Sequence, residues 1–295
     1  MKESSFEYEG KRITIMCCSK CNCKCTHCYI SYDGDIDPKV LEKMCKTLNE
    51  KYTLIINGTE VLLNKNYLKS LNISKQRRVL TNGIVIHNNY ELLHEVYETG
   101  VDSVALSYHY GIHSDISSVA YQTIVDDIQL IKKAGLNVTL MCTISKGNYD
   151  KVLTICEETL KLGVHHIRFF NYLKTGNALN LPDDNVLNQE QLNIFFSQLE
   201  IARKKYKKSD LTIKRNGTFG VDYTKNKNNF ECAAGYDEVV IAPNMKVYPC
   251  IYMTKQGYEI GEYTNGKVLL YNKPTHDRKK CLVKEMYNEL KPIKF

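Results

Sequence analysis

The sequence has 295 residues, of which 43% are hydrophobic and 25% charged, as is typical of a globular protein with one large or two modest domains. It has no apolar run near the ~18 residues of a membrane span, and its first residues lack the apolar stretch of a signal peptide. The net charge of +7 comes without an arginine-rich tract or a nucleic-acid motif. We therefore expect a cytoplasmic protein with neither nucleic acid nor membrane as a partner.

Strand-like and helix-like segments alternate in the first part of the chain. Asp37 and Pro38 are typical of a helix start, and Gly100 and Gly135 are typical of helix ends. This alternation predicts a parallel sheet with right-handed crossovers, as an open doubly wound sheet or a full or partial α/β barrel. Chemistry is then expected at the carboxyl ends of the strands. Strands are predicted at 12–17, 52–56, 77–81, 102–107, 136–144 and 165–172, and helices at 37–51, 64–71, 90–100, 121–135 and 149–163.

The pattern changes after residue 174. A helix is predicted at 188–207, a strand at 211–217, a hairpin at 238–250 and a further helix at 276–290. These elements favour a smaller α+β unit at the C-terminal end. We predict one domain over residues 1–180 and a second over residues 181–295.

Half of the twelve cysteines lie close together at 17–28, in the loop after the first predicted strand. In a reducing compartment, cysteines are metal ligands, catalytic thiols or core residues more often than disulfides. One reading is a zinc site, although no second cysteine pair lies nearby to close the tetrahedron. The other is three thiolates that hold three corners of a [4Fe–4S] cube and leave the fourth iron open. The zinc reading draws on Cys21, Cys23, Cys25, His27 and Cys28, and the cube on Cys21, Cys25 and Cys28.

The stretch CNCKCTHCY (21–29) resembles the signature of the radical S-adenosylmethionine (SAM) family, C-x3-C-x2-C followed by an aromatic residue, here Tyr29. Asn22 and His27 also match its commonest form. The resemblance implies an α/β fold with a partial (β/α)6 barrel, and a SAM-binding [4Fe–4S] cluster. It also implies an electron donor such as flavodoxin or ferredoxin, and cleavage of SAM to a 5′-deoxyadenosyl radical that abstracts a hydrogen atom.

The same resemblance suggests a SAM pocket. The family has a Gly-Gly-Glu-type turn after the second strand, and NGTE places Gly58, Thr59 and Glu60 there. Thr59 stands where a second glycine is usual. Threonine rarely takes a positive φ, so the sequence leaves the backbone conformation at this position open. Asn82 and Ser107, after the third and fourth strands, also match pocket positions. The arginine expected for the SAM carboxylate is missing, and Lys146 and Arg168 are the remaining candidates.

Three further cysteines, Cys232, Cys250 and Cys281, lie in the C-terminal part. They resemble the cluster-binding extension of peptide-modifying radical SAM enzymes, called SPASM in its full form and Twitch in its shortened form. The resemblance implies one auxiliary [4Fe–4S] cluster, whose fourth ligand is open. Met245 stands where the hairpin of this extension normally has a glycine.

The leading hypothesis is a radical SAM enzyme that crosslinks, epimerises or oxidises a residue of a peptide or small protein. One alternative is a radical SAM dehydrogenase of a small alcohol or amino-sugar, and a second is a non-catalytic zinc-binding module. An N-terminal leader-binding domain does not fit before Cys21. Cys142, late in the fifth strand, could donate a hydrogen atom to a substrate radical, although a packed core residue is the simpler interpretation.

Overall fold

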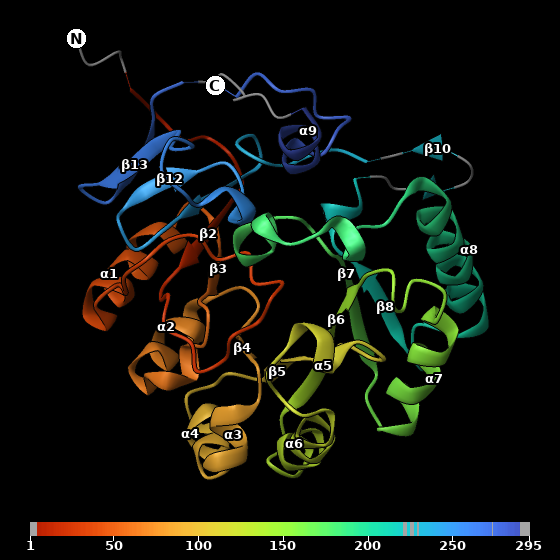
Figure 1. Ribbon diagram of the computed structural model, residues 1–295. Coiled ribbons are helices and arrows are strands. Elements are labelled where there is room, and N and C mark those ends of the chain that lie inside the picture. Colours follow the sequence, from red (N-terminus) through yellow and green to blue (C-terminus); the bar gives the residue numbers. More distant parts are fainter. Residues whose placement is uncertain (1–4, 221–222, 225–226, 229, 273, 290–295) are drawn as a thin grey trace.

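The computed structural model describes residues 5–220, 223–224, 227–228, 230–272 and 274–289. Its parallel strands curl around a central space, and helices cover their outer side (Figure 1). This confirms the predicted α/β class and the partial barrel. Within the described ranges, no helix is long and apolar enough to cross a membrane.

Seven parallel strands form the inner layer. Six of them agree with the predicted strands to within one residue at each end, because each has a run of apolar or alternating residues bounded by turn signals. The strands are β2 (Arg12–Met16), β3 (Thr53–Asn57), β4 (Arg78–Thr81), β5 (Ser103–Ser107), β6 (Asn137–Ile144), β7 (His166–Asn171) and β8 (Thr212–Arg215).

The helices bury their apolar faces against these strands. In α1 the Asp37 carboxylate accepts hydrogen bonds from the backbone N–H groups of Lys39 and Val40, as expected of an N-cap. The short helices α3 and α5 were not predicted, because five and four residues are too few to show helical periodicity. The helices of this layer are α1 (Pro38–Asn49), α2 (Leu68–Ile73), α3 (Ile84–Asn88), α4 (Leu92–Glu98), α5 (His113–Ile116), α6 (Tyr121–Lys133), α7 (Val152–Lys161) and α8 (Gln189–Lys205).

The parallel strands are divided between two sheets. One sheet has the order β4-β5-β6-β7-β8, so each strand pairs with the next one along the chain. Strands β2 and β3 pair in parallel in the other sheet. The barrel is therefore partial, and its strands change sheet between β3 and β4.

Residues 188–207 and 211–217 do not lie where the sequence interpretation put them. They were assigned to the C-terminal unit, but α8 packs on α7, and β8 pairs in parallel with β7 through Ile213 and Ile167. A crossover helix followed by a strand extends a parallel sheet in this way. The β/α alternation thus continues to residue 215, and a separate domain over residues 181–295 stays a prediction.

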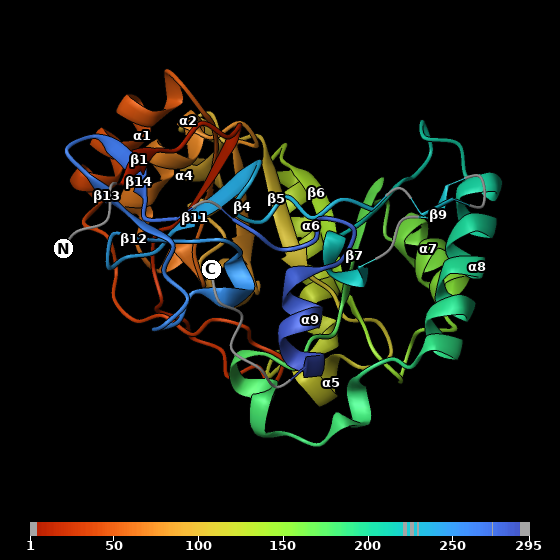
Figure 2. The ribbon, with the colours of Figure 1, turned by 90° about the horizontal axis from the view of Figure 1, so that it is seen from above.

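The remaining strands belong to the sheet of β2 and β3. The hairpin predicted at 238–250 is present as β11 (Glu238–Ile241) and β12 (Lys246–Tyr248), and β11 pairs in parallel with β2. Strands β13 (Gly261–Thr264), β14 (Lys267–Leu270) and β1 (Phe6–Glu7) follow in antiparallel order. Figure 2 shows these strands and α8 at opposite ends of the molecule. Strands β9 (Tyr223–Thr224) and β10 (Lys227–Asn228) form a separate pair, and helix α9 spans Leu282–Glu289.

Met245 closes the turn of the β11–β12 hairpin. Its N–H donates to the carbonyl of Ala242 at 2.9 Å, and its φ is +61°. A left-handed backbone costs a residue with a side chain roughly 1–2 kcal/mol. The absence of the usual glycine therefore does not change the turn conformation, which Met245 adopts in its place.

Candidate active site

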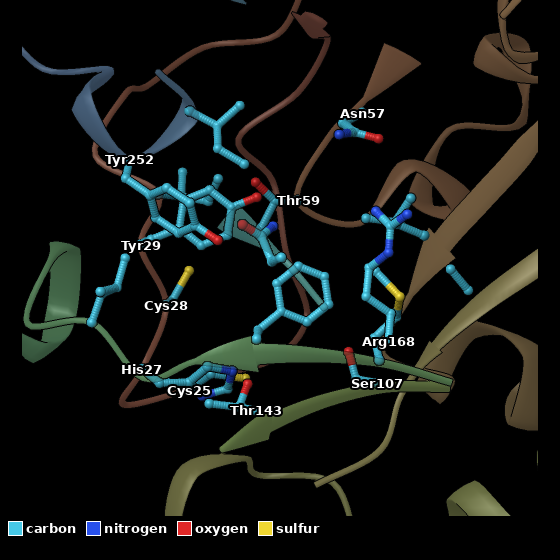
Figure 3. Close-up of a pocket in the computed structure, with 18 of the residues that line it drawn as sticks. Cys25, His27, Cys28, Tyr29, Asn57, Thr59, Ser107, Thr143, Arg168 and Tyr252 are labelled. Atoms are coloured by element: carbon cyan, nitrogen blue, oxygen red, sulfur yellow. The ribbon is translucent and has the colours of Figure 1, made fainter. Parts of the chain in front are cut away.

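A cavity of about 490 Å³ lies inside the curl of the strands (Figure 3). Its size is that of pockets that hold small ligands and cofactors. The lining comes from the loop after β2, from the strands, and from the chain segments that follow them. Eight of the predicted site residues are among the lining residues: Cys21, Cys25, Cys28, Tyr29, Gly58, Thr59, Asn82 and Ser107.

The three candidate cluster ligands lie in the loop between β2 and α1. Cys21 is exposed, whereas Cys25 and Cys28 are half-buried. The loop is fixed by a hydrogen bond from the Thr26 N–H to the Ile116 carbonyl at 3.1 Å. All three thiols thus border one cavity, from a loop that is held at its centre.

The geometry of the loop bears on whether it can hold a zinc ion or a [4Fe–4S] cube. Throughout the part of the chain that the structure describes, no three histidine, cysteine, aspartate or glutamate side chains converge as ligands of one ion. A tetrahedral zinc site needs such convergence. Thiolates around a cube each bind a different iron, so they surround a volume and do not meet at a point. Their role as cluster ligands stays a prediction.

Asn82 connects the cysteine loop to the turn after β3. Its Nδ2 donates to Oδ1 of Asn22 at 2.8 Å and lies 3.6 Å from Sγ of Cys21, while its backbone N–H donates to Oε2 of Glu60 at 2.8 Å. Asn22 and Asn82, which both match positions of the family, are therefore in contact beside Cys21, one of the predicted cluster ligands.

Glu60 lies behind the cavity wall. It is 1% exposed, it does not line the cavity, and its Oε1 makes no hydrogen bond within the described residues. Burial raises the pKa of Glu60 to about 7. In this position the carboxyl group supports Asn82, and direct binding of SAM by Glu60 stays a prediction.

Gly58 and Thr59 pack directly on Cys17 and Cys18, the first two cysteines of the stretch 17–28. A Cβ atom on Gly58 would lie 2.5 Å from Sγ of Cys18 and 3.2 Å from Sγ of Cys17, so only glycine fits. The Thr59 N–H donates to the Cys18 carbonyl at 3.0 Å. Thr59 does not have a positive φ, so it replaces the usual glycine without strain. Cys17 and Cys18 are buried and support this turn.

Two tyrosines join the N-terminal loop to the C-terminal part of the cavity. The ring centroids of Tyr29 and Tyr252 are 4.6 Å apart. Tyr29 follows Cys28 in sequence, and Tyr252 lies two residues after Cys250. Figure 3 shows both rings on the side of the cavity near Cys28, with Ser107 on the far side.

His27, which matches the family signature, lies beside the cysteine loop in contact with His109, and His109 stacks on His113; the last two had no predicted role. The ring of His109 lies 4.8 Å from that of His27 and 5.3 Å from that of His113. The Thr143 N–H donates to Nδ1 of His109 at 3.1 Å, and Nδ1 of His27 lies 3.0 Å from the Ile116 carbonyl. Burial lowers the pKa of His27 and His109, and that of His113 to about 4. These rings are therefore neutral.

The arginines on the cavity wall were missed, apart from Arg168. The signal that could have found them is the alternation of side chains along a strand. It points Arg78 and Leu80 to one face of β4, and Arg168 and Phe170 to one face of β7, and all four line the cavity. Lys146, the other candidate for a carboxylate partner, is exposed and does not line the cavity.

Cys142 lies outside the cavity. It is fully buried in β6, while its neighbours Met141 and Thr143 line the cavity. Because side chains alternate along a strand, Cys142 points to the helix side. This is the packed core position that the simpler interpretation predicts, and the geometry gives no support to a hydrogen-donor role.

The three C-terminal cysteines gather in one apolar cluster that also contains Tyr252 and Met253. They come from the segment before β11, the segment after β12 and the start of α9. Burial, followed by the charges of Cys281 and Cys232, raises the pKa of Cys250. Because Cys250 packs against the cluster that contains Cys232 and Cys281, the three thiols fit a shared cluster site. The auxiliary cluster itself stays a prediction.

No family model matches the sequence, and no curated protein matches it. Solved structures do match the fold. SuiB from Streptococcus suis, bound to the precursor peptide SuiA, aligns with a TM-score of 0.65 and 14% identity over 85% of this chain and 63% of SuiB. SuiB bound to S-adenosylmethionine aligns with a TM-score of 0.62 and 13% identity over 82% of this chain and 60% of SuiB.

A further neighbour is anSMEcpe with bound AdoMet, at a TM-score of 0.62 and 17% identity over 85% of this chain and 77% of that protein. The chain thus spans less than two thirds of SuiB and about three quarters of anSMEcpe. These neighbours are radical SAM enzymes. The protein therefore has the fold of the radical SAM enzymes, and the resemblance predicted from CNCKCTHCY is confirmed at that level.

Proposed function

We propose that the protein is a radical SAM enzyme that abstracts a hydrogen atom from a residue of a peptide or protein. One observation carries the proposal: the three cysteines of the motif border the same cavity as Asn82 and Ser107, which come from successive strands. Peptides bound to neighbours support the substrate class. SuiB is bound to its precursor peptide, and an anSMEcpe structure contains AdoMet and the Cp18Cys peptide.

In this proposal Cys21, Cys25 and Cys28 hold the SAM-binding [4Fe–4S] cluster. The cluster and SAM, when bound, supply the radical chemistry with an electron from a flavodoxin or ferredoxin. The protein supplies position and exclusion of water. Asn82 fixes the loop at Cys21, and Tyr29 closes the wall against Tyr252.

In the same proposal, the part of residues 181–295 that follows β8 carries a shortened auxiliary domain of the Twitch type. Cys232, Cys250 and Cys281 hold one auxiliary [4Fe–4S] cluster. Their shared apolar cluster contacts Tyr29, so the two predicted cluster sites have a packed aromatic contact between them.

Anaerobic reconstitution tests this function. We expect about seven to eight irons per chain, as two cubes require, and deoxyadenosine formation on reduction with SAM. Peptides encoded near the gene should stimulate that formation, and liquid chromatography with mass spectrometry should detect the modified residue. Stoichiometric zinc without deoxyadenosine would overturn the proposal, and a response to small alcohols or amino-sugars but to no peptide would replace the substrate class.

A further inference from the structure

The cavity has an excess of positive charge. Its one lining glutamate, Glu238, already has partners: Oε2 lies 3.0 Å from Nη1 of Arg12, and Oε1 accepts a hydrogen bond from the Thr14 hydroxyl at 2.9 Å. The histidines on the wall are neutral. The charged lining residues are Arg12, Arg78, Arg168, Arg215 and Glu238.

Arg78 and Arg168 are two of the lining guanidinium groups that this acid does not neutralise. Both are half-buried, and neither makes an ion pair within the described residues. Nε of Arg78 is buried and makes no hydrogen bond there. Burial, and then the charge of Arg168, lower the pKa of Arg78 to about 10. Two cations without an acidic partner thus border the same cavity from half-buried positions, which is unfavourable without an anion.

The neighbouring residue shows the contrast. Arg77 directly precedes Arg78, lies on the surface, and pairs with Asp102 at 2.9 Å. The arginine just before β4 thus has an acidic partner, whereas the inward arginine of β4 has none. An inward arginine that faces open volume is placed for a ligand that enters from outside.

The position of Arg168 separates this pair from the cysteine loop. Figure 3 shows Arg168 and Ser107 on one side of the cavity, and Cys25, His27 and Cys28 on the other. The cavity between them is lined by apolar side chains, among them Leu80, Met141 and Phe170. The same cavity thus offers cationic groups on one side and the cysteine loop on the other.

We propose that Arg78 and Arg168 bind a carboxylate of the substrate. The preferred substrate then has an aspartate, a glutamate or a C-terminal carboxylate near the carbon that loses hydrogen. Arginine suits this role because its planar fork pairs bidentately with a carboxylate. The inference rests on the proposed function and adds the chemical class of the substrate residue.

A carboxylate in this cavity can come from two sources, the substrate or the methionyl group of SAM. The open iron that chelates the SAM carboxylate would be at the cysteine loop, across the cavity from Arg168. The positions of the two groups favour the substrate as the ligand of the arginine pair.

The test uses reconstituted, SAM-bound protein and two fluorescent pentapeptides that differ in one central residue, glutamate or glutamine. Fluorescence anisotropy should show at least about tenfold tighter binding of the glutamate peptide. This ratio should fall to near one in Arg78→Met and Arg168→Met, and recover in part in Arg168→Lys, which keeps the charge. The matched control Arg77→Gln should keep the full ratio.

Equal binding of both peptides by the unaltered protein would overturn the inference, and so would a ratio that survives in both methionine variants. Equilibrium dialysis of SAM distinguishes the two sources of the carboxylate, the substrate and SAM. We expect unchanged SAM affinity in Arg78→Met and Arg168→Met. A tenfold loss of SAM affinity, with the peptide ratio unchanged, would assign the arginines to SAM and refute the inference.

Competition by glutarate and glutaramide tests the arginine site independently of the proposed peptide substrate. If no peptide binds, a preference for glutarate that is lost in Arg168→Met supports the arginine site and refutes only the peptide class. No preference between the two competitors would refute the arginine site. Melting temperatures check folding, and removal of one unpaired cation should leave them unchanged or raise them.

Discussion

The two groups of cysteines differ in how the chain brings them together. Cys21, Cys25 and Cys28 come from one short loop and border open volume, with Cys21 exposed. Cys232, Cys250 and Cys281 come from three separate segments and lie in an apolar cluster. The first group thus depends on local sequence, and the second on the tertiary fold. Loss of a thiol from the loop should affect chemistry alone, whereas loss of a thiol from the buried group should also affect stability.

The largest effect is expected from Cys25→Ala. Removal of one ligand should abolish SAM cleavage and lower the iron content by about four per chain, since a cube needs all three thiolates of the motif. Because the side chain borders open volume in a loop, the melting temperature of the metal-free protein should change little. Cys23→Ala is the control and should keep both iron and cleavage. Iron retained in Cys25→Ala would contradict the ligand assignment.

Cys250→Ala should lower iron by about half and also destabilise the fold by roughly 1–3 kcal/mol, because the thiol packs in an apolar cluster. Urea unfolding of metal-free protein measures the second effect. Cys156→Ala, a buried thiol of α7 remote from both groups, should destabilise similarly without any loss of iron. Equal iron in the two variants would exclude Cys250 as a ligand.

The Glu60→Gln variant tests whether Glu60, which supports Asn82 behind the cysteine loop, is protonated in the folded protein. The pKa of Glu60 is raised from 4.5 to about 7 in the folded state, so the unfolded chain loses this proton first as pH rises. Relative to the variant, the unaltered protein should lose about 3 kcal/mol between pH 4.5 and 7 and nothing further above that range. Urea titrations of both proteins across this range measure the difference, in which the histidine contributions cancel. A constant difference would show that Glu60 is not protonated in the folded state.

An effect on stability alone is expected from Gly58→Ala. Its Cβ would lie 2.5 Å from Sγ of Cys18, and displacement of a packed thiol should cost roughly 1–3 kcal/mol. Gly217→Ala is the control, since a Cβ there meets only Phe230 at an ordinary 3.6 Å. Unfolding in urea compares the two. An equal cost at both positions would show that the thiols under Gly58 do not constrain the turn.

Local patterns predicted the β/α part of the chain well. The apolar run of β3 and the cap at Asp37 are encoded within a few residues, and the cysteine motif is encoded within eight. Pairing of distant segments was not predictable in the same way. Nothing in the sequence of β8 distinguishes a strand that joins β7 from one in a separate unit. Arg78 was missed because a charged residue in a strand is usually solvated, and only the cavity shows that Arg78 and Arg168 point into it.

The parallel pairing of β11 with β2 has a consequence for synthesis of the chain. Ile15 is opposite Ile241, so the strand that leads into the cysteine loop has a free edge until a segment more than two hundred residues later has formed. At ribosomal rates of ~5–20 residues per second, this interval is roughly 10–50 s. An exposed edge is a site for mispairing with other chains. The nascent chain is therefore open to such mispairing during this interval.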